Sequence, residues 1–311
     1  MMVLDGLFII ELLSKWAGLA RCAPGDPIFK TSWIRTSLRI NLLRLENQIP
    51  FFLLQTLFDD TRVTRSGGDD QSLAKLMLDF MKYVKPGRDE ILKRIGNVEG
   101  KHLLDLCRLN FVPPPQQKPR NKDVQLIPNV EKLDAAGIKF KATECDTFLE
   151  IRFRNGVLEI PHIWMDDVTT LFFLNSVAYE QCYSSYCSNH MTAYTTFMAL
   201  LIKNPSDVGF LCDIEVMENY IGTDKKMVQF FDDMGKNVIC NFSKNCLSKV
   251  AEDVNEYRRK SWHVQWAGFK HTYFNTPWAF ISALAALTLP LLTMIQAFFA
   301  IYPYAGGKPI G

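Results

Sequence analysis

The chain has 311 residues, a formal net charge of +2 and eight cysteines. A charge so close to zero gives no overall field that would draw the protein to nucleic acid, so we expect no nucleic-acid partner. Eight cysteines in a chain of this length form no dense disulfide framework, which favours free thiols in a reducing compartment. The length is sufficient to bury one large core or two modest ones.

Residues 1–111 are predicted to form a helical N-terminal part. Acidic residues interrupt the first apolar run, which argues against an export signal and favours a half-buried helix. Apolar side chains then recur every three to four positions over 35–60, with a break at Pro50. Ser72 can cap the next helix, and a further helix is expected over 91–111.

A proline-rich linker over 112–124 separates this part from a second one over 125–270. Four prolines among polar residues in this stretch exclude a helix or a central strand. In the second part, 148–154 and 157–160 are rich in alternating apolar residues and flank Asn155-Gly156. This two-residue sequence suits a type I′ turn, so we predict a β-hairpin.

The rest of the second part returns to helical spacing. We expect helices over 170–182, 191–203, 213–221, 224–234 and 243–260. The predicted fold class is therefore mainly α with a small β-hairpin or sheet (α+β), to which the C-terminus adds one membrane helix.

Residues 277–303 are expected to form this transmembrane helix, followed by a short tail over 304–311. No Asp, Glu, Lys or Arg lies between Trp278 and Tyr302, and a helix over that run would span roughly 37 Å against a hydrocarbon core of about 30 Å. Aromatic residues at the two ends suit the headgroup level. Pro290 favours the alternative of a buried core helix, although helices in lipid tolerate proline.

Basic residues lie mainly on the N-terminal side of the apolar stretch. They are Arg258, Arg259, Lys260 and Lys270, whereas Lys308 follows it. The positive-inside rule therefore places the N-terminal body in the cytosol. We expect a single-pass protein of the plasma membrane or an endomembrane, with the lipid bilayer as one partner.

Sequence motifs for catalysis or cofactor binding are absent. The chain has no phosphate loop, no dinucleotide fingerprint, no nucleophile elbow and no zinc-protease motif. We therefore expect no catalytic residue and no cofactor. The Cys/His cluster Cys182, Cys187 and His190 lacks a fourth zinc ligand unless His162 joins it, so we expect idle thiols and no metal site.

Two pairs of adjacent carboxylates occur, Asp166-Asp167 and Asp232-Asp233. Adjacent residues on a helix point in different directions, so neither pair implies a shared site. We expect Asp166-Asp167 to lie at a helix N-terminus, where the helix dipole favours negative charge.

Several stretches taken together resemble the plant family called domain of unknown function 247. They are MMVLDGLFIIELL, LLRLENQIPFFLLQTLF, HLLDLCR, IPNVEKLDAAGIKF, FLEIRFRNGVLEIP and AYEQC, with the apolar C-terminal helix. The resemblance covers essentially the whole chain. It implies a plant protein with a C-terminal membrane helix, related to self-incompatibility determinants of grasses, and it implies no catalytic residues. Members usually carry a further N-terminal region, so we expect this copy to be truncated.

The leading hypothesis is a C-tail-anchored plant membrane protein whose cytosolic body binds an unidentified protein partner, without catalysis. Two alternatives stay open. One is an uncharacterised hydrolase or transferase that uses His162, Asp166, Asp167 and the Cys182/Cys187 region. The other is a truncated copy without function.

Overall fold

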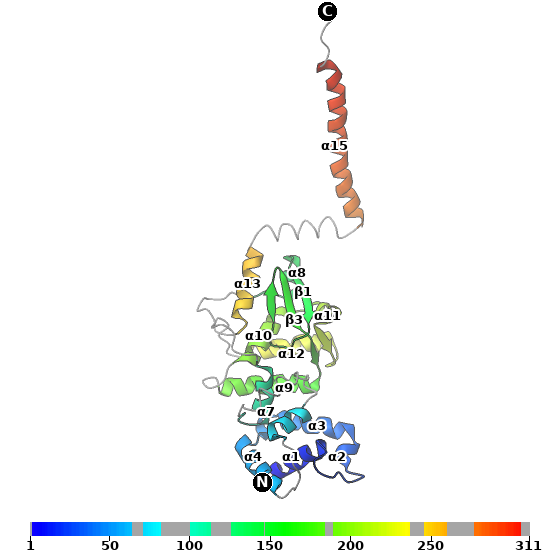
Figure 1. Ribbon diagram of the computed structural model, residues 1–311. Coiled ribbons are helices and arrows are strands. Elements are labelled where there is room, and N and C mark those ends of the chain that lie inside the picture. Colours follow the sequence, from blue (N-terminus) through cyan, green and yellow to red (C-terminus); the bar gives the residue numbers. More distant parts are fainter. Residues whose placement is uncertain are drawn as a thin grey trace, which may run out of the picture.

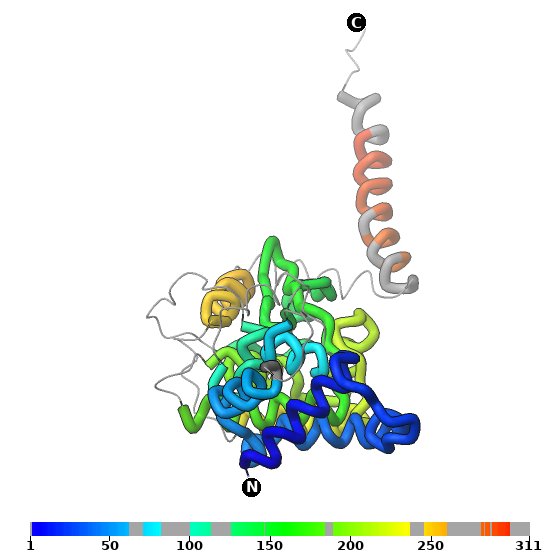
Figure 2. The backbone as a smooth tube through the Cα atoms, turned by 60° about the horizontal axis from the view of Figure 1, so that its bottom comes forward, coloured from blue at the N-terminus to red at the C-terminus, as the bar shows by residue number. Residues whose placement is uncertain are grey.

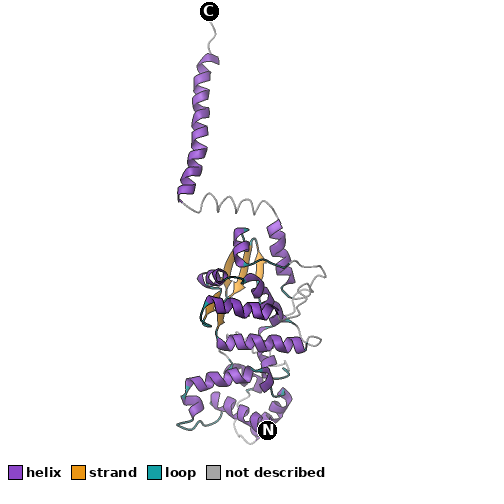
Figure 3. Cartoon of the chain, turned by 180° about the vertical axis from the view of Figure 1, so that it is seen from behind, coloured by secondary structure: helices purple, strands orange, loops and turns teal. Residues whose placement is uncertain are grey.

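The computed structural model shows a mainly helical protein in which short strands gather at one place (Figure 3). The residues that it describes are 2–63, 71–81, 100–112, 126–145, 147–183, 189–236, 246–259 and 277–305.

The N-terminal helices pack together at the end of the body that holds the N-terminus (Figures 1 and 2). The predicted break at Pro50 is confirmed, because α4 begins directly after it, and the Ser72 side chain caps α5 as expected by accepting from Lys75 N at 3.3 Å. These helices are α1 (Met2–Trp16), α2 (Pro27–Lys30), α3 (Ser32–Leu43), the 3-10 helix η1 (Leu45–Asn47), α4 (Phe51–Val63), α5 (Leu73–Phe80) and α7 (Leu103–Phe111).

Helix α9 (Asp167–Cys182) is the central element and lies between the N-terminal helices and the rest of the body (Figure 1). It packs against α3 and α7 on one side and against α10 (His190–Leu201) on the other. A helix that is covered on several sides needs apolar residues around much of its circumference. The buried Val168, Phe172, Phe173 and Val177 provide them.

The described part of the body contains four further helices. Helices α10 and α12 pack against each other, as do α11 and α12. The four helices are α8 (Val130–Ala135), α11 (Pro205–Asp213), α12 (Asp224–Lys236) and α13 (Ser248–Arg259).

The predicted hairpin is confirmed. Strand β2 (Arg152–Arg154) pairs antiparallel with β3 (Val157–Pro161), and both turn residues have positive φ, 51° for Asn155 and 78° for Gly156, as a type I′ turn requires. A Cβ at Gly156 would also lie 2.6 Å from the Tyr257 hydroxyl. The first strand is shorter than expected, because 148–151 enters the core instead of the sheet.

Two pairings were not predicted. Strand β1 (Lys139–Thr143) joins β3 in parallel, which gives the order β1-β3-β2. Strand β4 (Ile163–Met165) pairs in parallel with β5 (Met217–Asn219). The helix expected over 213–221 is wrong, because α11 ends at Asp213 and Glu215 adopts φ 59°, a left-handed conformation that no helix continues.

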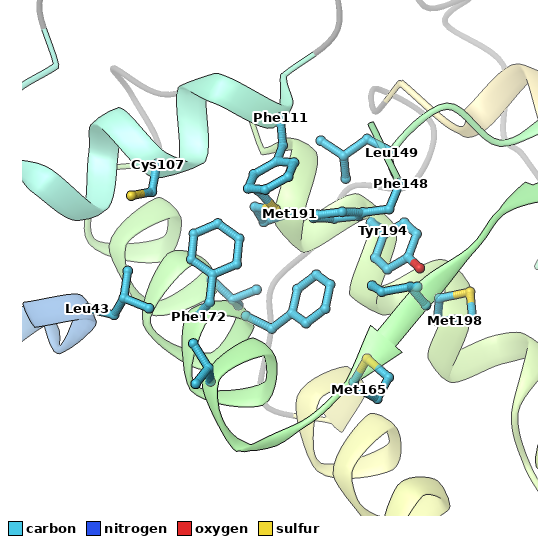
Figure 4. Packing of buried hydrophobic residues seen from close by; sticks show 14 of the residues in the cluster. Leu43, Cys107, Phe111, Phe148, Leu149, Met165, Phe172, Met191, Tyr194 and Met198 are labelled. Carbon is cyan, nitrogen blue, oxygen red and sulfur yellow. The ribbon is translucent and has the colours of Figure 1, made fainter. Parts of the chain in front are cut away.

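An aromatic cluster fills the centre of the core (Figure 4). Phe148 lies between Phe111 and Tyr194, with ring centroids 4.8 and 5.1 Å apart, and Phe173 stacks on Tyr194 at 5.5 Å. These rings come from α7, from the segment before β2, from α9 and from α10. The core therefore joins residues on both sides of the expected linker.

The predicted transmembrane helix is wrong by the test of length and hydropathy. Helix α15 (Pro277–Ala305) does form, but no helix is both long and apolar enough to cross a membrane among the residues that the structure describes. The same finding contradicts the expected single-pass membrane location with the body in the cytosol.

The alternative of a core helix is not supported for α15 either, since its described side chains are exposed, with Leu289 at 63% and Met294 at 70%. Several other expectations fall outside the described residues: nearly all of the linker 112–124, Lys260, Lys270, Cys187 and the tail from 306 onward. The proposed domain boundaries stay a prediction.

Candidate functional site

The outer face of the β4–β5 pair carries a group of aromatic and charged side chains. Side chains alternate along a strand, so the buried Ile163 and Met165 leave Trp164 pointing outward, and the register places Trp164 directly opposite Glu218. His162 lies two positions before Trp164, and Tyr220 two positions after Glu218, so both reach the same face. We call His162, Trp164, Glu218 and Tyr220 the β4–β5 surface.

The carboxylate of Glu218 is the centre of this surface. The Tyr220 hydroxyl donates to Oε2 at 2.6 Å, and the His162 Nε2 atom lies 3.0 Å from Oε1. The Trp164 indole lies opposite the same carboxylate and also lowers its pKa. These hydrogen bonds, that of Tyr220 foremost, hold the pKa of Glu218 below its usual range, so the group is anionic at neutral pH.

The rings around this carboxylate are open to solvent. Trp164 is 40% exposed and Tyr220 is 67% exposed, while the His162 ring meets the edge of Trp164 with centroids 5.0 Å apart. Large aromatic side chains normally bury most of their surface. An exposed Trp and Tyr held around a fixed anion have the composition of a binding site.

Further negative charges lie beside the β4–β5 surface. Burial first, and then the charges of Asp224, Asp213 and Glu218, raise the pKa of the Cys212 thiol, so these carboxylates lie within electrostatic range of it. Asn219 Nδ2 donates to Asp224 Oδ1 at 3.0 Å and ties α12 to β5. The edge of the sheet is therefore acidic.

Asp166 and Asp167 lie where a helix N-terminus was predicted. Asp166 Oδ1 accepts from Thr169 N at 2.8 Å and caps α9, and Asp167 occupies the first turn. This prediction is confirmed. Since Cys182 ends the same 16-residue helix, about 24 Å separates it from these carboxylates, so Asp166, Asp167 and Cys182 do not converge. Cys187 lies outside the described residues.

The other predicted side chains are also dispersed. Asp232 pairs with Lys236 and Lys203, whereas Asp233 accepts from Gln229 at 2.8 Å, so this pair diverges as expected. Within the described part of the chain, no group of three His, Cys, Asp or Glu side chains is placed to hold a metal ion.

The residues expected at the membrane have these positions. Arg258 and Arg259 end α13, and Arg258 donates to Asn255 Oδ1 at 3.1 Å. Trp278 and Tyr302 lie in α15, but their side chains are not among those that the structure describes. Pro290 is exposed near the middle of that helix.

A buried charged cluster is the feature that sequence reasoning missed. Arg108 Nη2 lies 2.9 Å from Asp105 Oδ1, and Arg108 Nη1 lies 3.3 Å from Glu180 Oε1. Glu180, fully buried, also accepts from the backbone N–H groups of Met191 and Thr192 at 3.2 and 2.8 Å, at the start of α10. We call Asp105, Arg108 and Glu180 the buried charged cluster.

Neighbouring side chains extend this cluster. His102 caps α7 by accepting from Asp105 N at 3.2 Å, and burial lowers its pKa. Gln48 Oε1 accepts from Leu104 N at 2.9 Å. The stretches LENQIPFF, HLLDLCR and AYEQC therefore meet at one point. Their composition was visible in the sequence, but nothing in any one of them indicates the other two.

The buried charged cluster has no open face to offer a substrate. Arg108 and Glu180 are at most 3% exposed. Cys107 beside it is equally inaccessible, and burial raises the pKa of its thiol to about 12, which removes the thiolate that a nucleophile needs. This cluster holds helices together, whereas the β4–β5 surface is open to solvent.

Comparison with known proteins places the chain among plant sequences. A family model described as a plant protein of unknown function matches residues 1–292. The UPF0481 protein At3g47200 of Arabidopsis thaliana is 35% identical over 333 aligned positions, which cover 99% of this chain and 69% of that protein. The putative UPF0481 protein At3g02645 of the same plant is 28% identical over 60% of this chain and 35% of its own length. No solved structure matches.

Proposed function

The chain belongs to the plant family of domain of unknown function 247, and from this premise we propose that it is a protein-binding module that acts through the β4–β5 surface, without catalysis. The observation that carries the proposal is the exposure of Trp164 and Tyr220 around the Glu218 carboxylate. Trp and Tyr are enriched among the residues that dominate the affinity of protein interfaces. Because hydrogen bonds already hold the surface in place, a partner loses little entropy in ordering it.

The arrangement supports binding over catalysis. Asp166 is engaged in capping α9, and Cys182 lies at the far end of that helix. The His162–Glu218 pair resembles the oriented base of a hydrolase, but such a base acts on a nucleophile within hydrogen-bond reach. Trp164 and Tyr220 lie beside this pair, and we assign their exposed rings to binding.

The experiment is cross-linked capture from plant extract with the full chain, quantified by mass spectrometry. The double variant Trp164→Ala/Tyr220→Ala removes both exposed rings, and Trp33→Ala removes a ring that is 67% exposed on α3. We expect the wild type and Trp33→Ala to recover the same partners. The recovered amount of these partners should be at least about tenfold lower with the double variant. Equal recovery by all three proteins, each with an unchanged melting curve, would overturn the proposal.

A narrower role in recognition between pollen and stigma is supported by the family resemblance alone. It requires expression in those tissues. Transcripts confined to leaf or root would remove this role and leave the protein-binding proposal standing.

A further inference from the structure

The charge of the β4–β5 surface indicates the chemistry of its partner. Glu218 is anionic, and Asp213, Glu215 and Asp224 lie on the segments that lead into and out of β5. Lys225 and Lys226 at the start of α12 offset part of this charge. A surface of this kind attracts cations and repels acidic segments.

The Glu218 carboxylate has room for one more donor. A carboxylate has about four acceptor positions, and the donors found on it come from Tyr220 and His162. Its side chain is 42% exposed, so a donor from another molecule can approach it from solvent.

The two exposed rings offer π-faces beside the same carboxylate. A cation placed over Trp or Tyr is attracted by the ring quadrupole, and arginine is the more frequent partner in proteins. The guanidinium of arginine is planar and weakly hydrated, so it stacks on a ring while its N–H groups donate to a carboxylate. The ammonium group of lysine is compact and strongly hydrated and gains less from this arrangement.

We propose that the β4–β5 surface binds the guanidinium of an arginine side chain on a basic segment of a partner protein, with Glu218 as its anion and Trp164 and Tyr220 as its stacking faces. This inference rests on the proposed protein-binding function and specifies the partner chemistry of the same surface.

The test is a titration of the full chain with three peptides that share uncharged Gly/Ser flanks and blocked ends. The central residue is arginine, lysine or citrulline, which has the shape of arginine without its charge. The readout is the indole N–H resonance of Trp164 in nitrogen-15 spectra, identified by its loss in Trp164→Phe. We expect a saturable shift with the arginine peptide, affinity weaker by about threefold or more with lysine, and no saturable shift with citrulline.

Variants identify the groups involved. Glu218→Gln keeps the shape of the side chain and removes its charge, so it should weaken the affinity for the arginine peptide by about tenfold or more. Glu131→Gln, the same change on the exposed face of α8, should leave the affinity unchanged. Equal shifts with arginine and citrulline, or full affinity in Glu218→Gln, would overturn the proposal.

The outcomes separate this inference from the proposed function. If Trp164→Ala/Tyr220→Ala loses its captured partners while the arginine peptide causes no shift, the surface binds protein but not arginine, and only this inference fails. If capture is also unaffected by the double variant, both fail. A shift with the arginine peptide that Glu218→Gln abolishes supports the inference at the level of individual residues.

Discussion

Two carboxylates in this protein are each held by more than one donor, but their surroundings are opposite. Glu180 receives a guanidinium and two backbone N–H groups and is fully buried. Glu218 receives a phenol and an imidazole, and its side chain is 42% exposed. Burial raises the pKa of Glu180, whereas hydrogen bonds lower that of Glu218.

The comparison shows that solvent access decides what a well-bonded carboxylate does. A buried ion must be matched by partners within the chain, because leaving it unpaired costs several kcal/mol. An exposed ion keeps its hydration and contributes little to stability. The buried group therefore specifies how helices α7, α9 and α10 meet, and the exposed group stays available to a second molecule.

The largest effect is expected when the buried charged cluster loses its cation. Arg108→Met leaves Asp105 and Glu180 buried without their guanidinium, and we expect the free energy of unfolding to fall by about 3–5 kcal/mol, a large share of a total of about 5–15 kcal/mol. Urea unfolding followed by circular dichroism measures the change.

The matched control for this prediction is Arg44→Met. Arg44 pairs with Glu46 at 3.5 Å on the surface, so its loss should cost less than about 1 kcal/mol. If both variants lose the same stability, the buried charged cluster does not have the structural role assigned to it.

An intermediate effect should appear in the pH dependence of stability. Burial raises the folded-state pKa of Glu180. The hydrogen bonds from Thr192 and the charge of Arg108 lower it, but by less. The folded protein thus holds this proton more tightly than the unfolded chain does. The contribution of Glu180 to stability is fully present below about pH 4.3 and is lost as pH rises through the raised pKa.

Glu180→Gln removes this titration and leaves the other groups in place. The unfolding free energy of the wild type, minus that of the variant, should therefore fall as pH rises from about 4. Urea unfolding over a series of pH values gives the difference. A difference that grows with pH would mean that Arg108 and the N–H groups of α10 outweigh burial.

The smallest effect is expected at the exposed carboxylate. Glu218→Gln should change the free energy of unfolding by less than about 0.5 kcal/mol, since the group stays hydrated. Its melting temperature should match that of Glu131→Gln. A loss as large as that of Arg108→Met would make the β4–β5 surface part of the folding core and remove the contrast drawn above.

Local signals predicted several elements correctly. Asn155-Gly156 specified the hairpin because few other pairs adopt positive φ at both positions. Pro50 and Ser72 marked helix boundaries, and Asp166 marked the start of α9. Each of these signals acts within a few residues, and such signals can be interpreted without knowing the rest of the fold.

Non-local pairing was not predictable in the same way. The segment 213–221 has helical spacing, yet Met217–Asn219 forms a strand because β4 offers it a partner that lies more than fifty positions earlier in the chain. Without that strand, Glu218 would not face Trp164, and the candidate site would not exist. The apolar run at the C-terminus likewise has the hydropathy pattern of a membrane helix, but among the described residues α15 does not meet the length and hydropathy of a membrane span.

The sequence by itself determined the helical class, the hairpin turn, the helix caps and the family, because each depends on short-range sterics or on motifs that stand together in the chain. The tertiary structure alone decided that Glu180 is buried against Arg108 and that Glu218 is exposed beside Trp164 and Tyr220. The physical reason is that solvent access and the partner of a charged group are set by segments distant in sequence, and these two quantities determine its role.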